Sequence, residues 1–277
     1  LEGAWRYAFF LSAILVIVGF WTRRKVEESP VFLKLAEMTR KIERAPLREA
    51  VRHDLGAMVR AFFVKAAENT FLYIFSTFLI FLATSHLGFS RQDTLMALLR
   101  GSALEVVVVL LAAWVSDRIG RRPVLIAGFV SAAIASLGLY TLQPGAPFST
   151  LQTAVMLSLA CHGIILGAMA AYMAEIFPAR TRYTAMSTSY QLASVAGGST
   201  APLVGTLLLQ MTGSSVSVAI YAAAVAVPAL IASYFSRETR GVELLESPSR
   251  TPSLTASPLR VSDNQNATLS EARRMMQ

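Results

Sequence analysis

The sequence is poor in charge and almost free of cysteine. Only 15% of its 277 residues are Asp, Glu, Lys or Arg, whereas a typical soluble domain carries about 25%. Cys161 is the single cysteine, which excludes a disulfide scaffold. The sequence also lacks the patterns of a metal-ligand cluster, a nucleophile elbow or a phosphate-binding glycine loop. We therefore predict no metal, no cofactor and no enzymatic activity.

Long apolar runs explain why so little charge is present. Hydrophobic residues make up 54% of the chain, and the mean hydropathy is +0.52. A helix rises about 1.5 Å per residue, so about 20 apolar residues cross a bilayer core. Stretches of about that length lie at residues 4–22, 57–83, 94–116, 123–142, 150–174, 184–211 and 216–236. This pattern excludes a single soluble domain and predicts an all-α integral membrane protein.

The net charge of +8 comes from basic residues that cluster in alternate connections between these runs. They are frequent at 23–55, 118–122 and 180–182 and after the last run, and scarce at 84–93, 143–149 and 211–215. Lys and Arg favour the cytoplasmic side of a membrane. The pattern predicts that the basic connections and the C-terminus are cytoplasmic, and that the partner of these charges is the lipid bilayer and not nucleic acid.

Composition divides the chain into four regions. We predict a transmembrane helix at 1–22, a basic cytoplasmic loop at 23–55 and a six-helix bundle at 56–240. Residues 241–277 are rich in Ser, Pro and Thr, which predicts a disordered cytoplasmic tail. The chain starts at Leu1 directly before an apolar run, so we expect it to be the C-terminal part of a longer, two-bundle protein.

Two ionisable residues lie near the middle of predicted spans, where polar side chains tend to face a cavity or a partner. Glu105 is about eleven residues, or roughly 16 Å, from each end of its span, and no cation lies three or four residues away. It must find a partner on another helix or hold a proton. His162 lies at similar depth, and imidazole titrates near neutral pH. Either residue fits a structural role or a role in proton and substrate movement.

One face of the second span carries polar side chains at helical spacing. Lys65 and Glu68 are three residues apart, so they can neutralise one another as a structural ion pair. The alternative is a polar stripe along a water-filled path, joined by similar side chains of the sixth span. The candidate substrate and proton path comprises Glu68, Asn69, Tyr73, Glu105, His162, Tyr190 and Gln191.

Small residues interrupt two of the spans. Gly163, Gly167 and Ala171 follow one another at fourfold spacing, which predicts a smooth helix face for close packing. In the sixth span, residues 197–202 contain two glycines and a proline, which predicts a bend because proline removes a helix hydrogen bond.

Two short connections combine arginines with acids. Residues 117–123 read D-R-I-G-R-R-P, and residues 175–182 read E-I-F-P-A-R-T-R. Asp117 ends a helix, where the helix dipole disfavours an anion, so it needs a cation or the N-terminus of another helix nearby. We expect it to contact the N-terminus of the sixth span as a latch between conformations. The predicted gating residues are Asp117, Arg118, Gly120, Arg121, Arg122, Glu175, Arg180 and Arg182.

These connections resemble those of the major facilitator superfamily, which has a D-R-x-G-R-R turn. Other segments are similar to its metabolite:proton symporter family, over about residues 3 to 241. They are Trp5-Arg6, 27–32 (E-E-S-P-V-F), Ala67-Glu68-Asn69, Glu105, His162-Gly163, 174–178 (A-E-I-F-P), Arg180, Arg182-Tyr183 and 190–192 (Y-Q-L). One departure is Ala113, which stands where the family turn opens with glycine.

The resemblance implies a twelve-helix transporter of which this chain holds the C-terminal six-helix bundle plus one preceding transmembrane helix. Substrate would bind near the membrane midplane between two bundles and be reached alternately from each side. The family moves organic acids and zwitterionic osmolytes, driven by protons. The expected partners are therefore a small metabolite, protons and an N-terminal helical bundle, and the expected location is the bacterial inner membrane.

Three functions remain open from the residues. The first is proton-coupled symport of a small organic acid or zwitterionic metabolite. The second is facilitated transport without coupling, in which Glu105 and His162 are structural. The third is a transport-inactive truncated membrane protein or sensor that binds partners through the basic loop and the tail.

Overall fold

The computed structural model describes residues 4–25, 46–179 and 181–241. Most of the predicted loop, Arg180 and nearly all of the predicted tail lie outside these residues. The described elements are helical: α1 (Ala4–Lys25), α3 (Pro46–Tyr73), η1 (Ile74–Phe78), α4 (Leu79–Ser85), α5 (Arg91–Ile119), α6 (Arg121–Tyr140), α7 (Phe148–Glu175), α8 (Arg182–Ala193), η2 (Ser194–Ser199), α9 (Ala201–Thr212) and α10 (Val216–Tyr234). The prediction of an all-α protein is confirmed for this part of the chain.

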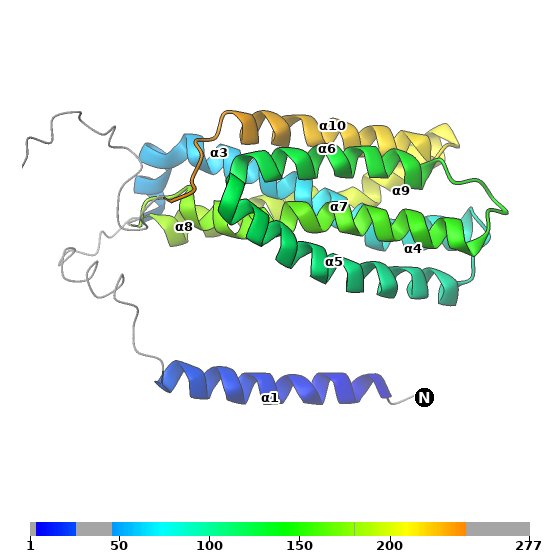
Figure 1. Cartoon of the computed structure of the whole chain (residues 1–277), viewed down its shortest axis with the longest axis horizontal. Coiled ribbons are helices and arrows are strands. Elements are labelled where there is room, and N and C mark those ends of the chain that lie inside the picture. Colours follow the sequence, from blue (N-terminus) through cyan, green and yellow to red (C-terminus); the bar gives the residue numbers. More distant parts are fainter. Residues whose placement is uncertain (1–3, 26–45, 180, 242–277) are drawn as a thin grey trace, which may run out of the picture.

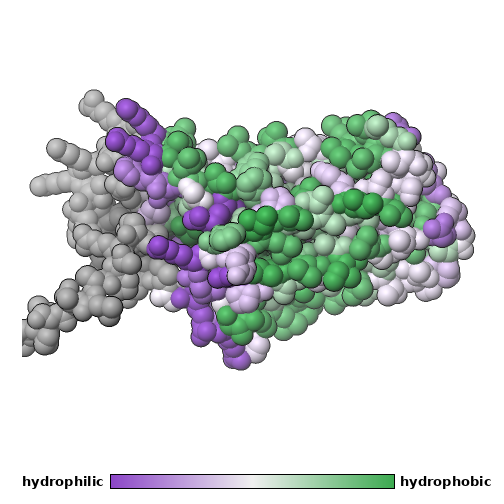
Figure 2. All heavy atoms as spheres, turned by 90° about the horizontal axis from the view of Figure 1, so that it is seen from above, coloured by the Kyte–Doolittle hydropathy of each residue, from purple (hydrophilic) through white to green (hydrophobic). Residues whose placement is uncertain are grey.

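Six helical stretches are long and apolar enough to cross a membrane: Leu47–Ser85, Arg91–Ile119, Arg121–Tyr140, Phe148–Glu175, Arg182–Thr212 and Val216–Tyr234. They run side by side as one bundle (Figure 1). Figure 2 shows a hydrophobic flank between two ends at which hydrophilic residues gather. This distribution fits a bundle whose flank lies in lipid and whose ends lie in water.

The first two predicted spans differ from the observed helices. The prediction began the second span near residue 57, but α3 begins at Pro46, so the end of the predicted loop is helical. Residues 4–22 are helical within α1, which lies apart from the bundle in Figure 1. That residues 4–22 span a membrane stays a prediction.

Helix α7 lies in the bundle between α5 and α6, and α10 packs on α6 and α3 (Figure 1). Glycines bring α7 close to α5. A Cβ on Gly167 would lie 2.9 Å from both the Ala112 Cβ and the Ala113 nitrogen, and one on Gly163 would lie 3.1 Å from the Glu105 carbonyl oxygen. The predicted packing face of Gly163 and Gly167 is therefore confirmed, and the missing glycine at position 113 is offset by glycine on the facing helix.

Two spans contain a wider turn of π-helix. In the second span this turn is η1, where the Tyr140 hydroxyl donates to the Ile74 carbonyl oxygen at 2.7 Å. In the sixth span it is η2, which contains the predicted glycine pair. A Cβ on Gly198 would lie 2.9 Å from the Tyr73 ring, so glycine permits η2 to approach the second span. Because π-turns are often found at functional sites, the second and sixth spans are candidates to carry functional residues.

Candidate functional site

His162 of α7 lies between two carboxylates from different helices. Its Nδ1 is 2.5 Å from Glu105 Oε1 on α5, and its Nε2 is 3.5 Å from Glu68 Oε1 on α3. The side chains of His162 and Glu68 are each only 2% exposed, and that of Glu105 is 14% exposed. Glu105 therefore finds its partner on another helix, which was one of the two alternatives that the sequence left open.

Lys65 extends this arrangement on α3. Its Nζ donates to Glu68 Oε2 at 2.5 Å, and both side chains are buried. The same ammonium lies 4.2 Å from the centre of the Tyr190 ring, which is a cation–π contact with α8. We call Lys65, Glu68, Glu105 and His162 the midplane cluster.

The charge of the midplane cluster depends on the protonation of His162. Lys65 offsets one of the two carboxylates, so the cluster carries a formal charge of −1 while His162 is neutral. One added proton makes the cluster neutral. Because an uncompensated charge is costly at membrane depth, the cluster is well suited to take up and release a proton.

The remaining residues of the predicted path flank the cluster. Asn69 donates from Nδ2 to Ser194 Oγ at 3.0 Å and so joins α3 to η2. Tyr73, which packs on Gly198, is 39% exposed, and Tyr190 is 37% exposed. Gln191 is also exposed. The buried ionisable groups thus lie behind partly exposed aromatic and amide side chains.

A second cluster of charges lies at the predicted cytoplasmic end, centred on the Arg121 guanidinium. Its Nε and Nη2 donate to the two oxygens of Glu175 at 3.2 and 3.0 Å. Its Nη1 donates to Ser116 Oγ at 2.8 Å and also to Asp117 Oδ1. The first residue of α6 therefore joins the end of α5 to the end of α7. We call the four residues Asp117, Arg121, Glu175 and Glu238 the Arg121 cluster. The contacts of Glu238 are described next.

Glu238 caps the N-terminus of α6. Its Oε1 accepts from the Arg121 backbone N–H at 2.8 Å, and its Oε2 accepts from that of Arg122 at 3.2 Å. Gly120, with φ +108°, lies so close to the Glu238 carboxylate that a Cβ would overlap it. A carboxylate at this position satisfies free N–H groups and complements the helix dipole. The glycine of the D-R-I-G-R-R turn thus makes room for the cap.

The Asp117 carboxylate pairs with Arg121, four residues along the chain. The cation, one of the two expected kinds of partner, is therefore found, and contact with the N-terminus of the sixth span stays a prediction. Arg118 and Arg122 lie over aromatic rings, those of Trp114 and Tyr234, at 3.6 and 4.6 Å. Arg182 donates to the Phe177 carbonyl oxygen, and Arg180 lies outside the described residues. A latch role for these residues stays a prediction.

Sequence reasoning missed two acids that join helix ends. Glu238 follows the last span and lies between Arg237 and Arg240. This acid among basic residues was the only signal in the sequence. Asp54 accepts from the Thr181 hydroxyl at 2.5 Å and joins α3 to the connection before α8. Asp54 was placed within the predicted loop, so no helix contact was expected of it. Both acids lie at the end of the bundle that carries Arg121, and Glu238 belongs to the Arg121 cluster.

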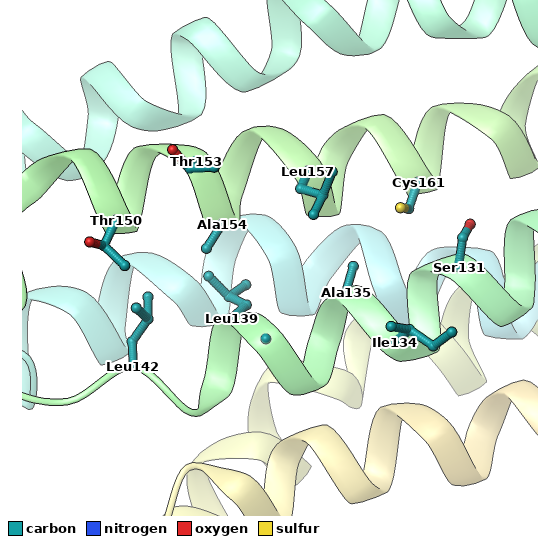
Figure 3. A pocket seen from close by; sticks show the side chains of 11 residues that line it. Ser131, Ile134, Ala135, Leu139, Leu142, Thr150, Thr153, Ala154, Leu157 and Cys161 are labelled. Carbon is teal, nitrogen blue, oxygen red and sulfur yellow. The ribbon is translucent and has the colours of Figure 1, made fainter.

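A separate apolar groove runs between α6 and α7 (Figure 3). Its volume is about 500 Å³, and its lining includes Leu139, Leu157 and the thiol of Cys161. The residues that line it are uncharged. Although Cys161 is adjacent to His162 in sequence, the groove is not part of the midplane cluster.

Comparisons with known proteins agree with this architecture. Over 244 residues the chain is 32% identical to the inner membrane metabolite transport protein YhjE of Escherichia coli, which covers 85% of this chain and 54% of that protein. It is 29% identical to the shikimate transporter of Escherichia coli, over 80% of this chain and 51% of that protein. It is 26% identical to the citrate-proton symporter of Klebsiella pneumoniae, over 88% of this chain and 54% of that protein.

The chain thus spans about half the length of the curated relatives it matches. A family model described as Major Facilitator Superfamily matches residues 73–271, which is most of the chain. That match starts at the end of α3 and includes every helix from α4 to α10. With its six apolar helices, this chain is a multi-pass membrane protein that belongs to the major facilitator superfamily.

Proposed function

We propose that this chain is the C-terminal part of a proton-coupled symporter that carries a small organic acid or zwitterionic metabolite by alternating access. An N-terminal bundle would provide the other wall of the transport path. The bacterial inner membrane, with the C-terminus in the cytoplasm, is the proposed location. The names of the relatives, which include a shikimate transporter and a citrate-proton symporter, support both the substrate class and the coupling.

The observation that carries this proposal is the position of His162 between Glu68 and Glu105. Imidazole changes its charge near neutral pH, and in the protonated ring both nitrogens are donors, one facing each carboxylate. A proton that arrives at Glu105 can pass to His162 across the 2.5 Å contact. The three residues come from three different helices, so movement of these helices would change the spacing on which proton transfer depends.

Alternating access by movement of two bundles requires each bundle to keep its shape while it moves. The Arg121 cluster supplies contacts of this kind, because Arg121 joins Glu175 to Asp117 across α5, α6 and α7. We propose that it keeps this end of the C-terminal bundle a rigid unit while the two bundles move against each other. Arg118, Arg122 and Arg182 would carry charge at the membrane surface beside it.

The test is uptake into vesicles that contain the complete transporter, this chain with its N-terminal bundle. Radiolabelled shikimate, citrate and glycine betaine are supplied with and without an inward proton gradient, and a protonophore is added at the end. We expect accumulation of at least one of the three probes, with collapse on addition of the protonophore.

A pair of histidine variants locates the coupling. His162→Gln removes the titrating group, so uptake should lose its response to the gradient. His86→Gln is the matched control, because His86 is exposed at the end of α4 and contacts the Phe81 ring. If His162→Gln still accumulated a probe as the unaltered protein does, proton coupling at His162 would be wrong. Gradient-independent uptake by the unaltered protein would indicate an uncoupled facilitator.

A further inference from the structure

We infer that Lys65 is the cation that binds a carboxylate of the transported metabolite, and that Glu68 occupies this cation while the site is empty. This inference rests on the proposed function and extends it, because it assigns a substrate-binding residue. The sequence offered Lys65 only as a structural partner of Glu68 or as part of a polar stripe. The contacts of its neighbours suggest a different role.

Lys65 is a buried cation with unused capacity for hydrogen bonds. An ammonium group carries three N–H donors, and the contacts described for it are one carboxylate oxygen of Glu68 and the face of the Tyr190 ring. The aromatic face is a weaker partner than a second carboxylate oxygen. A carboxylate that displaced the ring would therefore gain a strong contact at little cost to the site.

The Tyr190 ring covers the Lys65 ammonium, and part of the tyrosine is exposed. The residue is 37% exposed, whereas Lys65 is 3% exposed, and the ring lies over the ammonium at 4.2 Å. The residue therefore reaches from the buried cation to the surface. Rotation of one side chain would expose the cation to a ligand, without movement of a helix.

Glu68 lies within reach of two groups that can be cations, Lys65 and protonated His162. Its Oε2 accepts from Lys65 at 2.5 Å, and its Oε1 lies 3.5 Å from His162 Nε2. That nitrogen is buried and has no hydrogen-bond partner within the described structure. When His162 is protonated, Nε2 becomes a charged donor facing Glu68, and the carboxylate can move toward it and away from Lys65.

The groups that face this exchange are few. Tyr190 approaches Lys65 from α8, His162 approaches Glu68 from α7, and Glu105 of α5 reaches the cluster through His162. From η2 the polar contacts near this level are those of Ser194 with Asn69 and of the Gly197 carbonyl oxygen with the Thr70 hydroxyl, and none of these groups titrates. Arrival of the proton at His162 is thus the event that frees Lys65.

Conservation of charge favours binding of one carboxylate with one proton. The empty cluster carries a formal −1 with His162 neutral. One proton and one carboxylate together leave that value unchanged, whereas a carboxylate alone would raise the buried charge to −2. Because additional uncompensated charge at this depth is unfavourable, the proton increases the affinity for the carboxylate, and by reciprocity the carboxylate increases the affinity for the proton.

The experiment is equilibrium binding of radiolabelled shikimate, citrate and glycine betaine to the complete transporter in detergent, from pH 5 to 8. Three variants separate the roles. Glu68→Gln frees Lys65, so we expect tighter binding that changes less with pH than in the unaltered protein. Lys65→Met/Glu68→Gln removes both charges without leaving one unpaired, and we expect affinity to fall about tenfold or more. Lys65→Arg keeps the cation and should retain most of the affinity.

The control is Arg100→Met, which removes a cation that binds Gln152 on α7 outside the cluster; its affinity should stay unchanged. Equal affinity in the double variant and the unaltered protein would overturn the role of Lys65, and so would a protein that binds none of the three probes. If binding followed the expected order but vesicles showed no accumulation, the proposed symport would fail while the carboxylate site would stand.

Discussion

Two clusters of charged side chains join the same helices, α5 and α7, and they differ in the kind of cation at their centre. In the midplane cluster the central group is His162, which two carboxylates approach. In the Arg121 cluster the central group is a guanidinium that is held by Glu175, Asp117 and Ser116. Imidazole titrates near neutral pH, whereas guanidinium stays charged at every pH a cell experiences.

Hydrogen bonding sharpens this difference. The Arg121 guanidinium donates four hydrogen bonds, and Glu238 and Thr239 add further bonds to the Arg121 backbone and to Glu175. The midplane cluster leaves His162 Nε2 without a hydrogen bond. A permanent cation with many hydrogen bonds holds its partners in place, whereas a titrating group with a free nitrogen can change partners. This difference is the basis of our proposal that the midplane cluster couples protons and that the Arg121 cluster provides rigidity.

We expect the largest difference between the clusters when one glutamate of each is replaced by glutamine. Glu105→Gln removes a proton carrier, so uphill accumulation should fall to passive equilibration. A gradient of one pH unit supplies about 1.4 kcal/mol per proton, enough for about tenfold accumulation. Glu175→Gln should reach the same final accumulation as the unaltered protein, at a lower initial rate. Time courses of probe uptake into vesicles measure both quantities, and loss of accumulation in both variants would contradict the division of roles.

Arg121→Met should cause the largest loss of stability in the second cluster. The Arg121 side chain is 10% exposed and that of Glu175 is 15% exposed, so the substitution leaves a largely buried carboxylate without its cation. Breaking such a pair costs up to about 3 kcal/mol. Thermal unfolding in detergent measures the loss. Arg118→Met is the control, because Arg118 is exposed and stacks on Trp114. If it lowered the stability as much as Arg121→Met does, the loss could not be attributed to the buried Arg121–Glu175 pair.

Gly120→Ala should cost about 1–3 kcal/mol, because φ of +108° is strained for alanine. Its Cβ would also displace the Glu238 carboxylate from the N-terminus of α6. Gly138→Ala, within α6, is the control, since its Cβ would meet no atom within 4 Å. There alanine should be neutral or stabilising by up to about 1 kcal/mol. Melting temperatures that fall equally for both variants would show that the cap is unimportant.

Asp117→Asn should have the smallest effect. Asp117 is 64% exposed, and Arg121 keeps Glu175 when the aspartate is lost. An exposed ion pair contributes less than about 1 kcal/mol. We expect a slightly lower melting temperature, somewhat slower uptake and unchanged probe affinity. A strong loss of affinity would instead place Asp117 in the substrate site.

The helices could be predicted because a membrane span depends on local properties. The length of an apolar run and the fixed rise of a helix place a residue at a certain depth, and this was enough to locate Glu105 and His162 near the middle of their spans. Helix ends were less certain. The first turns of α3 are polar and resemble a loop in composition. They are helical because side chains such as Ala50 and Met58 are buried against the bundle.

The partners of the charged residues could not be predicted in the same way. Glu105 and His162 lie 57 positions apart, and Glu238 lies 117 positions from Arg121. Which side chains meet depends on the rotation of each helix about its axis, and a span that is apolar on every side contains little information about that rotation. By itself the sequence determined that the chain crosses the membrane and how deep its acids and histidine lie. Only tertiary packing, through close contacts such as that of Gly167 with α5, decided that His162 would lie between two carboxylates and that Lys65 would share one of them.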